Sequence, residues 1–280
     1  MTIAEVVVDM TRVLGSTDEA RELLALLHDQ PRHWPSVARD ERLSAQDVRI
    51  AMNAATRRAT GMPLQYAARR AAFRHFTLDV DERVLIPRPE TELLVDIVLD
   101  LTGSAPGGVA VDVGTGSGAI ALALASEGHF AQVIATDVSL DALAVARANV
   151  DRLATAAGAA IELRHGSLLG PVPERGLRAI VSNPPYIAFE ETAVLPSSVR
   201  DWEPAVALYS ARDGMAATAR LVREAAASLA PAGVLALETD YRRAATVADL
   251  AASHGAYADV RVLLDLTGRE RFVVARRREE

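Results

Sequence analysis

The sequence predicts an α/β protein with a doubly wound, mostly parallel sheet, preceded by a small helical domain and a β-hairpin. Apolar residues recur at helical spacing near the N-terminus, alternate as in a strand from Phe73, and then fall into alternating helices and strands from Glu90 onward. Strands that alternate with helices form a parallel sheet covered on both faces. We therefore expect a helical domain over 1–72, a hairpin linker over 73–89 and an α/β domain over 90–280.

The N-terminal region carries clear helix-start signals. Apolar residues at helical spacing over 6–14 are followed by Ser16, which has the character of an N-cap. Ser44 precedes another helical stretch and has Asp47 three residues later, as in a capping box. No strand-like alternation occurs before Phe73, so we expect a helical bundle up to that point.

Changes in the spacing of apolar residues along the chain predict the hairpin and the α/β region. Alternating apolar residues over 76–80, then Asp81 and Glu82, predict a strand that turns towards a second strand over 84–86. Later strands are expected at 109–113, 133–136, 161–164, 179–181, 234–237, 260–264 and 272–275. Helices are expected at 91–101, after the glycine-rich loop, at 140–153 and at 216–229.

A glycine-rich loop separates the strand at 109–113 from the next helix. Its candidate binding residues are Gly114, Thr115, Gly116, Ser117 and Gly118. Glycines allow a ligand to approach the backbone, and a helix start offers free N–H groups. Asp137 ends the next strand, where its carboxylate can accept hydrogen bonds from a ribose. Gly114, Gly116 and Ala119 also satisfy the dinucleotide pattern, so a nicotinamide-dependent oxidoreductase remains an alternative.

The segment after the fourth strand indicates the chemistry. It reads Asn183-Pro184-Pro185-Tyr186 and is expected at the carboxyl edge of the sheet, beside the cofactor crevice. An amide nitrogen is a poor nucleophile because its lone pair is delocalised. The side-chain oxygen of Asn183 and the carbonyl of Pro184 can accept its hydrogens and orient it, and the prolines stiffen the loop. Tyr186 can stack on a planar group or on a sulfonium cation.

These motifs together resemble the class I methyltransferases that methylate amide or exocyclic amine nitrogens. More narrowly, the chain is similar to the HemK/PrmC family, which methylates the glutamine of the Gly-Gly-Gln motif of peptide chain release factors. The resemblance covers nearly the whole chain. It is carried by the glycine loop, Asn183 to Tyr186, Gly61-Met62-Pro63-Leu64-Gln65-Tyr66, Leu85-Ile86-Pro87-Arg88-Pro89-Glu90-Thr91-Glu92, Glu203-Pro204, Asp213-Gly214 and Leu266-Thr267-Gly268-Arg269-Glu270-Arg271.

The resemblance implies the roles of several residues. It implies an N-terminal domain that docks a release factor and a catalytic domain that binds S-adenosylmethionine. Cofactor contacts then fall on the glycine loop, Asp137, Ser167, Leu168 and Asn183, while Asn183 to Tyr186 hold the accepting group. Arg88 and Glu90 are assigned either to the methionine end of the pocket or to bracing the hairpin.

Several positions depart from the family pattern. Arg69 replaces a glycine, Ser167 stands where an acid is usual, and Glu238-Thr239-Asp240 replaces a glutamate followed by an isoleucine or histidine and a glycine. The alternative hypothesis is therefore a paralogue that methylates a free guanidino or amide compound such as L-arginine. Glu238, Asp240, Glu190 or Glu191 would then pair with the charge of that substrate.

Composition argues against several other functional classes. The net charge of −7 argues against broad nucleic-acid binding, which needs concentrated positive charge. No long apolar run or export signal is present, so we expect a cytoplasmic protein with no membrane partner. All 30 basic residues are arginine, which excludes lysine Schiff-base chemistry. With no cysteine and no paired histidine motif, we expect no metal.

Overall fold

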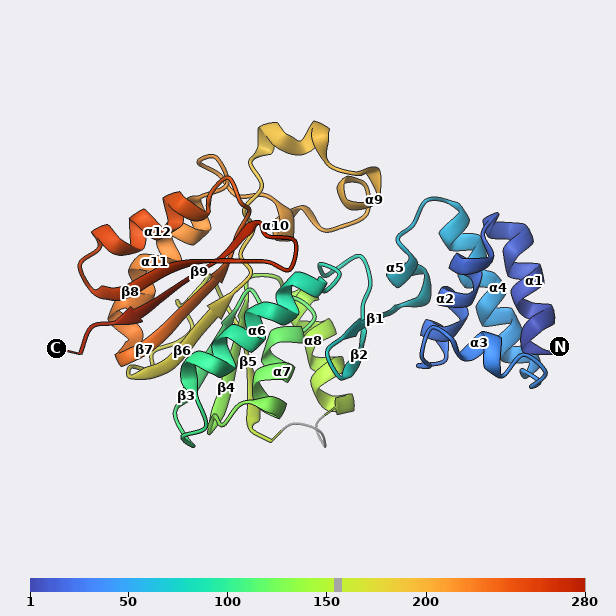
Figure 1. Cartoon of the computed structure of the whole chain (residues 1–280), viewed down its shortest axis with the longest axis horizontal. Helices are drawn as coiled ribbons and strands as arrows, with labels where there is room; N and C mark the ends of the chain where they lie inside the picture. Colours follow the sequence, from blue (N-terminus) through green and yellow to red (C-terminus); the bar gives the residue numbers. More distant parts are fainter. Residues whose placement is uncertain (154–157, 280) are drawn as a thin grey trace. The chain divides into compact units, whose positions relative to one another are not determined.

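The computed structural model describes residues 1–153 and 158–279 of the chain (Figure 1). The chain divides into two compact units, each with its own core. The first consists of Met1–Glu82 with Leu195–Glu203, and the second of Arg83–Val194 with Pro204–Glu280. No helix in these described ranges is long and apolar enough to cross a lipid bilayer.

The first unit is a helical bundle with a small hairpin. Its helices are α1 (Ile3–Leu14), α2 (Thr17–Leu27), α3 (Trp34–Val37), α4 (Ala45–Ala59), α5 (Leu64–Ala68) and α9 (Ser197–Arg200). Both predicted caps are confirmed. The Ser16 hydroxyl accepts the N–H of Glu19 at 3.2 Å, and Ser44 and Asp47 form a reciprocal capping box at the start of α4.

The hairpin lies earlier in the chain than the sequence predicted. Strand β1 (Arg70–Phe73) pairs antiparallel with β2 (Phe76–Asp79), and 84–86 lies outside any strand. The tight turn at Arg74 and His75 places Phe73 opposite Phe76, where both side chains are buried. The first strand was missed because its alternation is carried by alanines, whose small side chains give a weak pattern.

The second unit contains a seven-stranded sheet among its described residues. The strands are β3 (Val109–Val113), β4 (Gln132–Asp137), β5 (Ala160–His165), β6 (Leu177–Ser182), β7 (Leu229–Glu238), β8 (Tyr257–Leu264) and β9 (Glu270–Arg277), in the order β5-β4-β3-β6-β7-β9-β8. Strands β3 to β7 run parallel, and β9 is antiparallel to both of its neighbours. The predicted doubly wound, mostly parallel sheet is confirmed.

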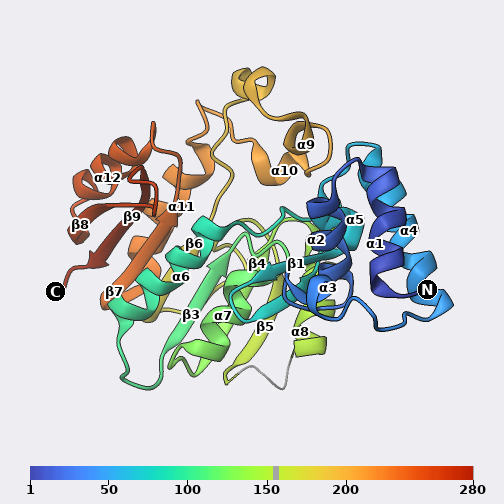
Figure 2. The ribbon, with the colours of Figure 1, turned by 45° about the vertical axis from the view of Figure 1, so that its right-hand side comes forward.

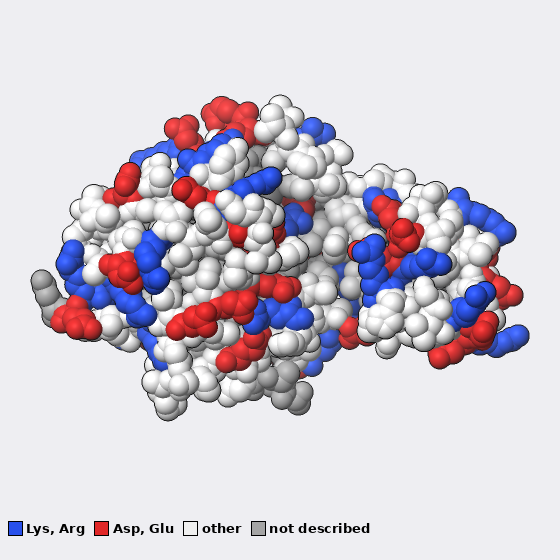
Figure 3. Space-filling view, viewed as in Figure 1, with Lys and Arg blue, Asp and Glu red and all other residues white. Residues whose placement is uncertain are grey.

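Helices cover both faces of this sheet (Figures 1 and 2). On one face lie α6 (Pro89–Thr102), α7 (Ala119–Glu127) and α8 (Leu140–Leu153), packed side by side. On the other lie α11 (Ala216–Ser228) and α12 (Ala244–Ser253), whose apolar residues share a core with the sheet. Acidic side chains follow α6 on the face shown in Figure 3, because its outer residues include Asp96 and Asp100. The apolar stripe of α6 faces inward, as in a typical amphipathic helix.

Candidate functional site

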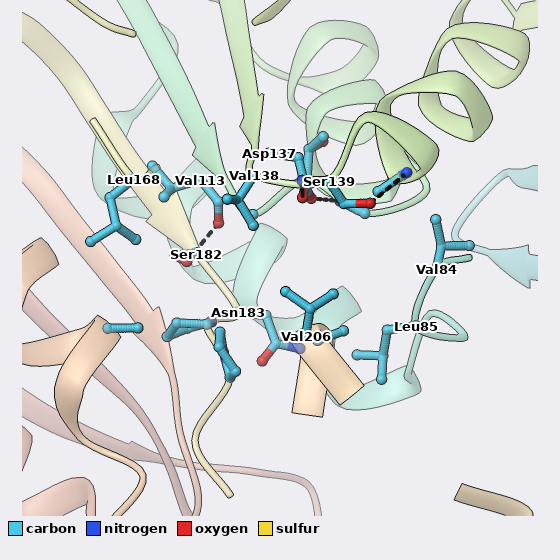
Figure 4. Close-up of a pocket in the computed structure, with 18 of the residues that line it drawn as sticks. Val84, Leu85, Val113, Asp137, Val138, Ser139, Leu168, Ser182, Asn183 and Val206 are labelled. Atoms are coloured by element: carbon cyan, nitrogen blue, oxygen red, sulfur yellow. Dashed lines mark hydrogen bonds between the residues drawn. The ribbon is translucent and has the colours of Figure 1, made fainter. Parts of the chain in front are cut away.

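A cavity of about 470 Å³ opens in the second unit at the carboxyl edge of the sheet (Figure 4). Its walls come from residues 83–85, from Thr91 in α6, from the segments that follow β3, β4, β5 and β6, and from α10 (Ala205–Leu208) through the start of α11. Strand order reverses at β3, whose neighbours are β4 and β6. Ligands of doubly wound proteins bind at such a switch point, and the volume suits a small organic molecule.

The glycine loop forms one wall of this cavity. Gly114 and Gly116 have φ values of 75° and 54°, in the left-handed region that favours glycine. No atom lies within 4 Å of where a Cβ would stand on either residue, so the bare backbone faces open space. Thr115 and Ser117 also line the cavity, whereas Gly118 caps the start of α7 and is not among the described lining residues.

Asp112 anchors the glycine loop and the start of α7 through two hydrogen bonds. Its Oδ2 atom accepts the hydroxyl of Thr115 at 2.6 Å and the backbone N–H of Ala121 at 3.0 Å. The side chain is fully buried, and this burial raises the pKa of Asp112 to about 7. We did not single out Asp112 from the sequence, although an acid within an apolar strand was an available signal.

Asp137 links the second strand of the site to the same loop. Its Oδ2 atom accepts the N–H of Gly116 at 2.9 Å, and its Oδ1 atom accepts the N–H of Ser139 at 2.9 Å. Burial raises the pKa of Asp137, while these backbone donors favour its ionised form. The carboxylate lines the cavity and keeps further lone pairs for a ligand (Figure 4).

Ser167 and Leu168 form the wall after β5. The hydroxyl of Ser167 lies 3.4 Å from Nη1 of Arg220, which donates to it from α11. The carbonyl of Leu168 accepts the hydroxyl of Thr136 at 3.0 Å, and Leu168 has a left-handed backbone conformation with φ of 52°. Arg220 therefore brings a cation to the same wall of the cavity.

The Asn-Pro-Pro-Tyr segment begins directly after β6. Asn183, Pro184 and Pro185 line the cavity, and Tyr186 is not among the described residues that do. Burial raises the pKa of the Tyr186 phenol, and the nearby charge of Glu238 adds to this effect. The amide Nδ2 of Asn183 donates to the hydroxyl oxygen of Thr91 at 3.3 Å.

Thr91 connects this segment to a buried acid. Its hydroxyl donates to Oε2 of Glu238 at 2.8 Å, and Glu238 is only 2% exposed. Burial raises the pKa of Glu238 to about 7, against the opposing effects of the Thr91 hydrogen bond and of Arg271. Thr91 belongs to the motif that begins at Leu85, and nothing in the sequence predicts its contact with Asn183.

Known proteins resemble this chain over most of its length. The Methyltransferase small domain family matches residues 87–196. The release factor glutamine methyltransferase of Gloeobacter violaceus is 43% identical over 76% of this chain and 74% of its own length. That of Burkholderia pseudomallei is 40% identical over 90% of this chain and 89% of its own length. The chain belongs to the release factor glutamine methyltransferase family.

Solved structures support the fold of this methyltransferase. A methyltransferase from Pyrococcus furiosus is 20% identical, with a TM-score of 0.54, over 72% of this chain and 88% of that one. A 16S rRNA methyltransferase from T. thermophilus, solved with AdoMet and guanosine, is 20% identical with a TM-score of 0.51. The match covers 75% of this chain and 50% of the 16S rRNA methyltransferase chain. The expected class I fold and family are confirmed, and neither the oxidoreductase nor the guanidine alternative is favoured.

The four residues expected near the substrate of this methyltransferase lie outside the described lining of the cavity. They are Arg88, Glu90, Glu238 and Asp240. Glu238 bonds to Thr91, and Asp240 accepts from Arg242 at 2.5 Å and from Arg243 at 3.1 Å. These two acids are thus engaged by side chains of the protein itself.

The other two acids considered for a cationic substrate are placed differently. Glu191 pairs with Arg243 at 2.9 Å, and Glu190 is exposed. No cluster of metal-ligating side chains occurs in the described part of the chain.

Proposed function

We propose that this methyltransferase transfers the methyl group of S-adenosylmethionine to the side-chain amide nitrogen of the glutamine in the Gly-Gly-Gln motif of a peptide chain release factor. The observation that carries the proposal is that Asn183 and Pro184 line the same cavity as Asp137 and the glycine loop. The names of the relatives supply the substrate.

The residues around the cavity fit this cofactor. Asp137 offers carboxylate oxygens for the ribose hydroxyls, and the exposed backbone at Gly114 and Gly116 leaves room for the amino-acid portion. Ser167 and Leu168 supply the wall for the adenine. When bound, S-adenosylmethionine supplies an electrophilic methyl group on a positively charged sulfur.

Asn183 and Pro184 orient the nitrogen that receives the methyl group. Each offers one oxygen to an N–H of the glutamine amide, which turns the nitrogen lone pair towards the methyl carbon. The methyl group would come from the bound cofactor, which would leave as S-adenosylhomocysteine, and the amide nitrogen would lose one proton to solvent. Since the proton leaves after transfer, the site needs oriented acceptors rather than a strong general base.

The segment after Asn183 is held rigidly for this task. The N–H of Ile187 donates to the carbonyl of Leu208 at 3.1 Å, and the carbonyl of Ile187 accepts the N–H of Ser210 at 2.9 Å. Gly214 packs so closely that a Cβ on it would stand 2.2 Å from the carbonyl oxygen of Tyr186. The acceptor oxygens therefore have fixed positions before a substrate binds.

Methyl transfer to an intact release factor tests this proposal. The purified protein is incubated with radiolabelled S-adenosylmethionine and the release factor, and the labelled peptide is located by mass spectrometry. We expect one methyl group on the Gly-Gly-Gln glutamine, and none on a release factor that carries alanine there. Free L-arginine serves as a second acceptor; label on arginine with none on the release factor would contradict the proposal.

A further inference from the structure

We propose that Thr91 and Glu238 are positioning residues that fix the side-chain amide of Asn183 in the one orientation that presents its oxygen to the substrate. This inference rests on the proposed function, because it assigns Asn183 Oδ1 the task of accepting an N–H from the substrate nitrogen. It concerns side chains that are far apart in the sequence and that meet only in the folded protein.

The sheet register and the start of α6 bring the three residues together. Ser182 at the end of β6 lies opposite Leu237 on β7, and Asn183 and Glu238 are the next residues of these two segments. Glu238 is the last residue of β7, where it pairs with Phe272 of β9. Thr91 stands in the first turn of α6, between them, and is 5% exposed. The resulting chain of hydrogen bonds runs from Asn183 Nδ2 to Thr91 Oγ1 at 3.3 Å, and from that hydroxyl to Glu238 Oε2 at 2.8 Å.

The direction of this chain follows from the number of hydrogens available. A threonine hydroxyl has a single hydrogen, and an ionised carboxylate can only accept. Thr91 therefore donates its hydrogen to Glu238 and can act only as an acceptor towards Asn183. Only the NH₂ end of the Asn183 amide can satisfy those lone pairs, so the carbonyl end Oδ1 must turn the other way.

The opposite orientation of Asn183 would oppose methyl transfer. A flipped amide would point its own N–H groups at the N–H groups of the substrate, and two donors cannot bond to each other. The flipped form would instead attract the substrate carbonyl, which places the wrong atom before the methyl group. Thr91 and Glu238 thus act on catalysis through Asn183. Glu238 lies outside the described lining of the cavity, and Thr91 lines the cavity but donates its hydroxyl hydrogen to Glu238.

The ionised form of Glu238 is required for this direction. Burial raises its pKa to about 7, and the charged groups that act on it are Arg88, Glu90 and Arg271. A neutral Glu238 can donate to Thr91 and release the Thr91 hydrogen towards Asn183. The experiments are therefore performed at a pH well above 7, where the carboxylate is ionised.

Kinetics of Thr91 variants provide the main test. Thr91→Val keeps the shape of the side chain and removes the hydroxyl, so we expect kcat for the release factor to fall at least about fivefold, the equivalent of one hydrogen bond. The dissociation constant for S-adenosylhomocysteine should stay within about twofold, because valine keeps the shape of this cavity-lining side chain and the lost hydroxyl bonds to Asn183 and Glu238. Thr91→Ser restores the hydroxyl and should recover most of the rate.

A matched control and a double variant sharpen the result. Thr102→Val removes a hydroxyl from the other end of α6, where its bonds within the described part of the chain are to backbone carbonyls of its own helix, and should leave kcat unchanged. Glu238→Gln should lower kcat in the presence of Thr91 and have no further effect in Thr91→Val. Wild-type kcat in Thr91→Val, or an equal loss from Glu238→Gln in both backgrounds, would overturn the inference.

A spectroscopic readout separates this inference from the proposed function. The side-chain NH₂ of Asn183 is observed by ¹⁵N NMR and assigned by its loss in Asn183→Ala. Its proton shifts should change in Thr91→Val and remain in place in Thr102→Val. If they are unchanged in Thr91→Val, the positioning role is wrong, whereas failure of the wild-type protein to methylate the release factor would refute the proposed function alone.

Discussion

The carboxylate of Asp137 accepts the backbone N–H of Gly116 at 2.9 Å and so joins the end of β4 to the loop that follows β3. Both residues line the cavity. Asp137 therefore both shapes the glycine loop and supplies oxygens for a ligand. Removal of its carboxylate should affect binding before it affects any later step.

We expect Asp137→Ala to weaken binding of S-adenosylhomocysteine about ten- to hundredfold, because hydrogen bonds to a charged group contribute about 1.5–3 kcal/mol. Isothermal titration calorimetry measures the loss. Asp141→Ala, at an exposed acid in the first turn of α8, is the matched control. Equal affinities for Asp137→Ala and wild type would show that this carboxylate does not contact the ligand.

Asn183→Ala should remove transition-state stabilisation while cofactor binding survives. The loss of an oriented acceptor corresponds to about 3 kcal/mol or more, or a fall in kcat of at least about a hundredfold. Single-turnover methylation of the release factor measures this change, with S-adenosylhomocysteine affinity measured in parallel. Asn53→Ala, at an exposed position of α4, is the control. Full activity in Asn183→Ala would refute the role of this side chain.

The buried acid Glu238 should make the free energy of unfolding depend on pH. Its pKa rises from 4.5 in the unfolded chain to about 7 in the folded protein. Between these values the folded state holds the proton that the unfolded state has lost, so stability falls as pH rises through this range. The total effect at pH 8 is on the order of 3 kcal/mol.

Glu238→Gln removes this titration. Chemical denaturation at a series of pH values should show that the variant loses less stability than wild type between pH 4.5 and 7. Asp112 has a similarly raised pKa and leaves part of the slope in place. Parallel curves for the two proteins would mean that Glu238 titrates at its ordinary pKa.

Arg69→Gly should stabilise the first unit. Arg69 ends α5 with φ of 56°, a left-handed conformation that is costly for any residue with a Cβ, and glycine relieves this strain. After the backbone entropy of glycine is subtracted, we expect a gain of about 0.5–1 kcal/mol in thermal or chemical denaturation. Arg69→Ala separates the backbone from the side chain, since alanine keeps the strain and should give no gain.

Gly214→Ala should damage both stability and activity. A Cβ at this position would stand 2.2 Å from the carbonyl oxygen of Tyr186, which belongs to the substrate-orienting segment. We expect a loss of unfolding free energy above about 2 kcal/mol, together with a lower kcat. Gly255 has a similar φ of 76° with no atom near its Cβ position, so Gly255→Ala measures the strain of the backbone alone. Equal losses for the two variants would show that the close contact with Tyr186 is unimportant.

Local sequence signals predicted the elements that position the cofactor. Strand β3 (Val109–Val113) and helix α8 (Leu140–Leu153) have the predicted bounds, because branched residues mark the strand and apolar residues recur at helical spacing in the helix. Helix α12 (Ala244–Ser253) was missed, since alanines on every side blur its periodicity. This omission hid the fact that Asp240 is paired with Arg243 in the turn that begins α12, and so left Asp240 as a candidate for a cationic substrate.

Contacts between distant segments could not be predicted in this way. Thr91 and Glu238 are 147 residues apart, and no spacing rule relates the first turn of one helix to the end of a remote strand. The full set of cavity-lining residues could not be predicted from the sequence either. It depends on the order of strands in the sheet, which places β3 between β4 and β6. Motif residues such as Asn183 could be identified early, whereas the side chains that hold them required the folded structure.

The position of β9 determines how many strands the sheet loses when the C-terminus of the chain is removed. This strand lies between β7 and β8 and supplies the hydrogen bonds that attach β8 to the rest of the sheet. Truncation of the chain before Glu270, as by a frameshift, would therefore remove β9 and leave β8 without its hydrogen-bonding partner. It would also expose the inner edge of β7, an unprotected apolar edge of the kind that drives aggregation.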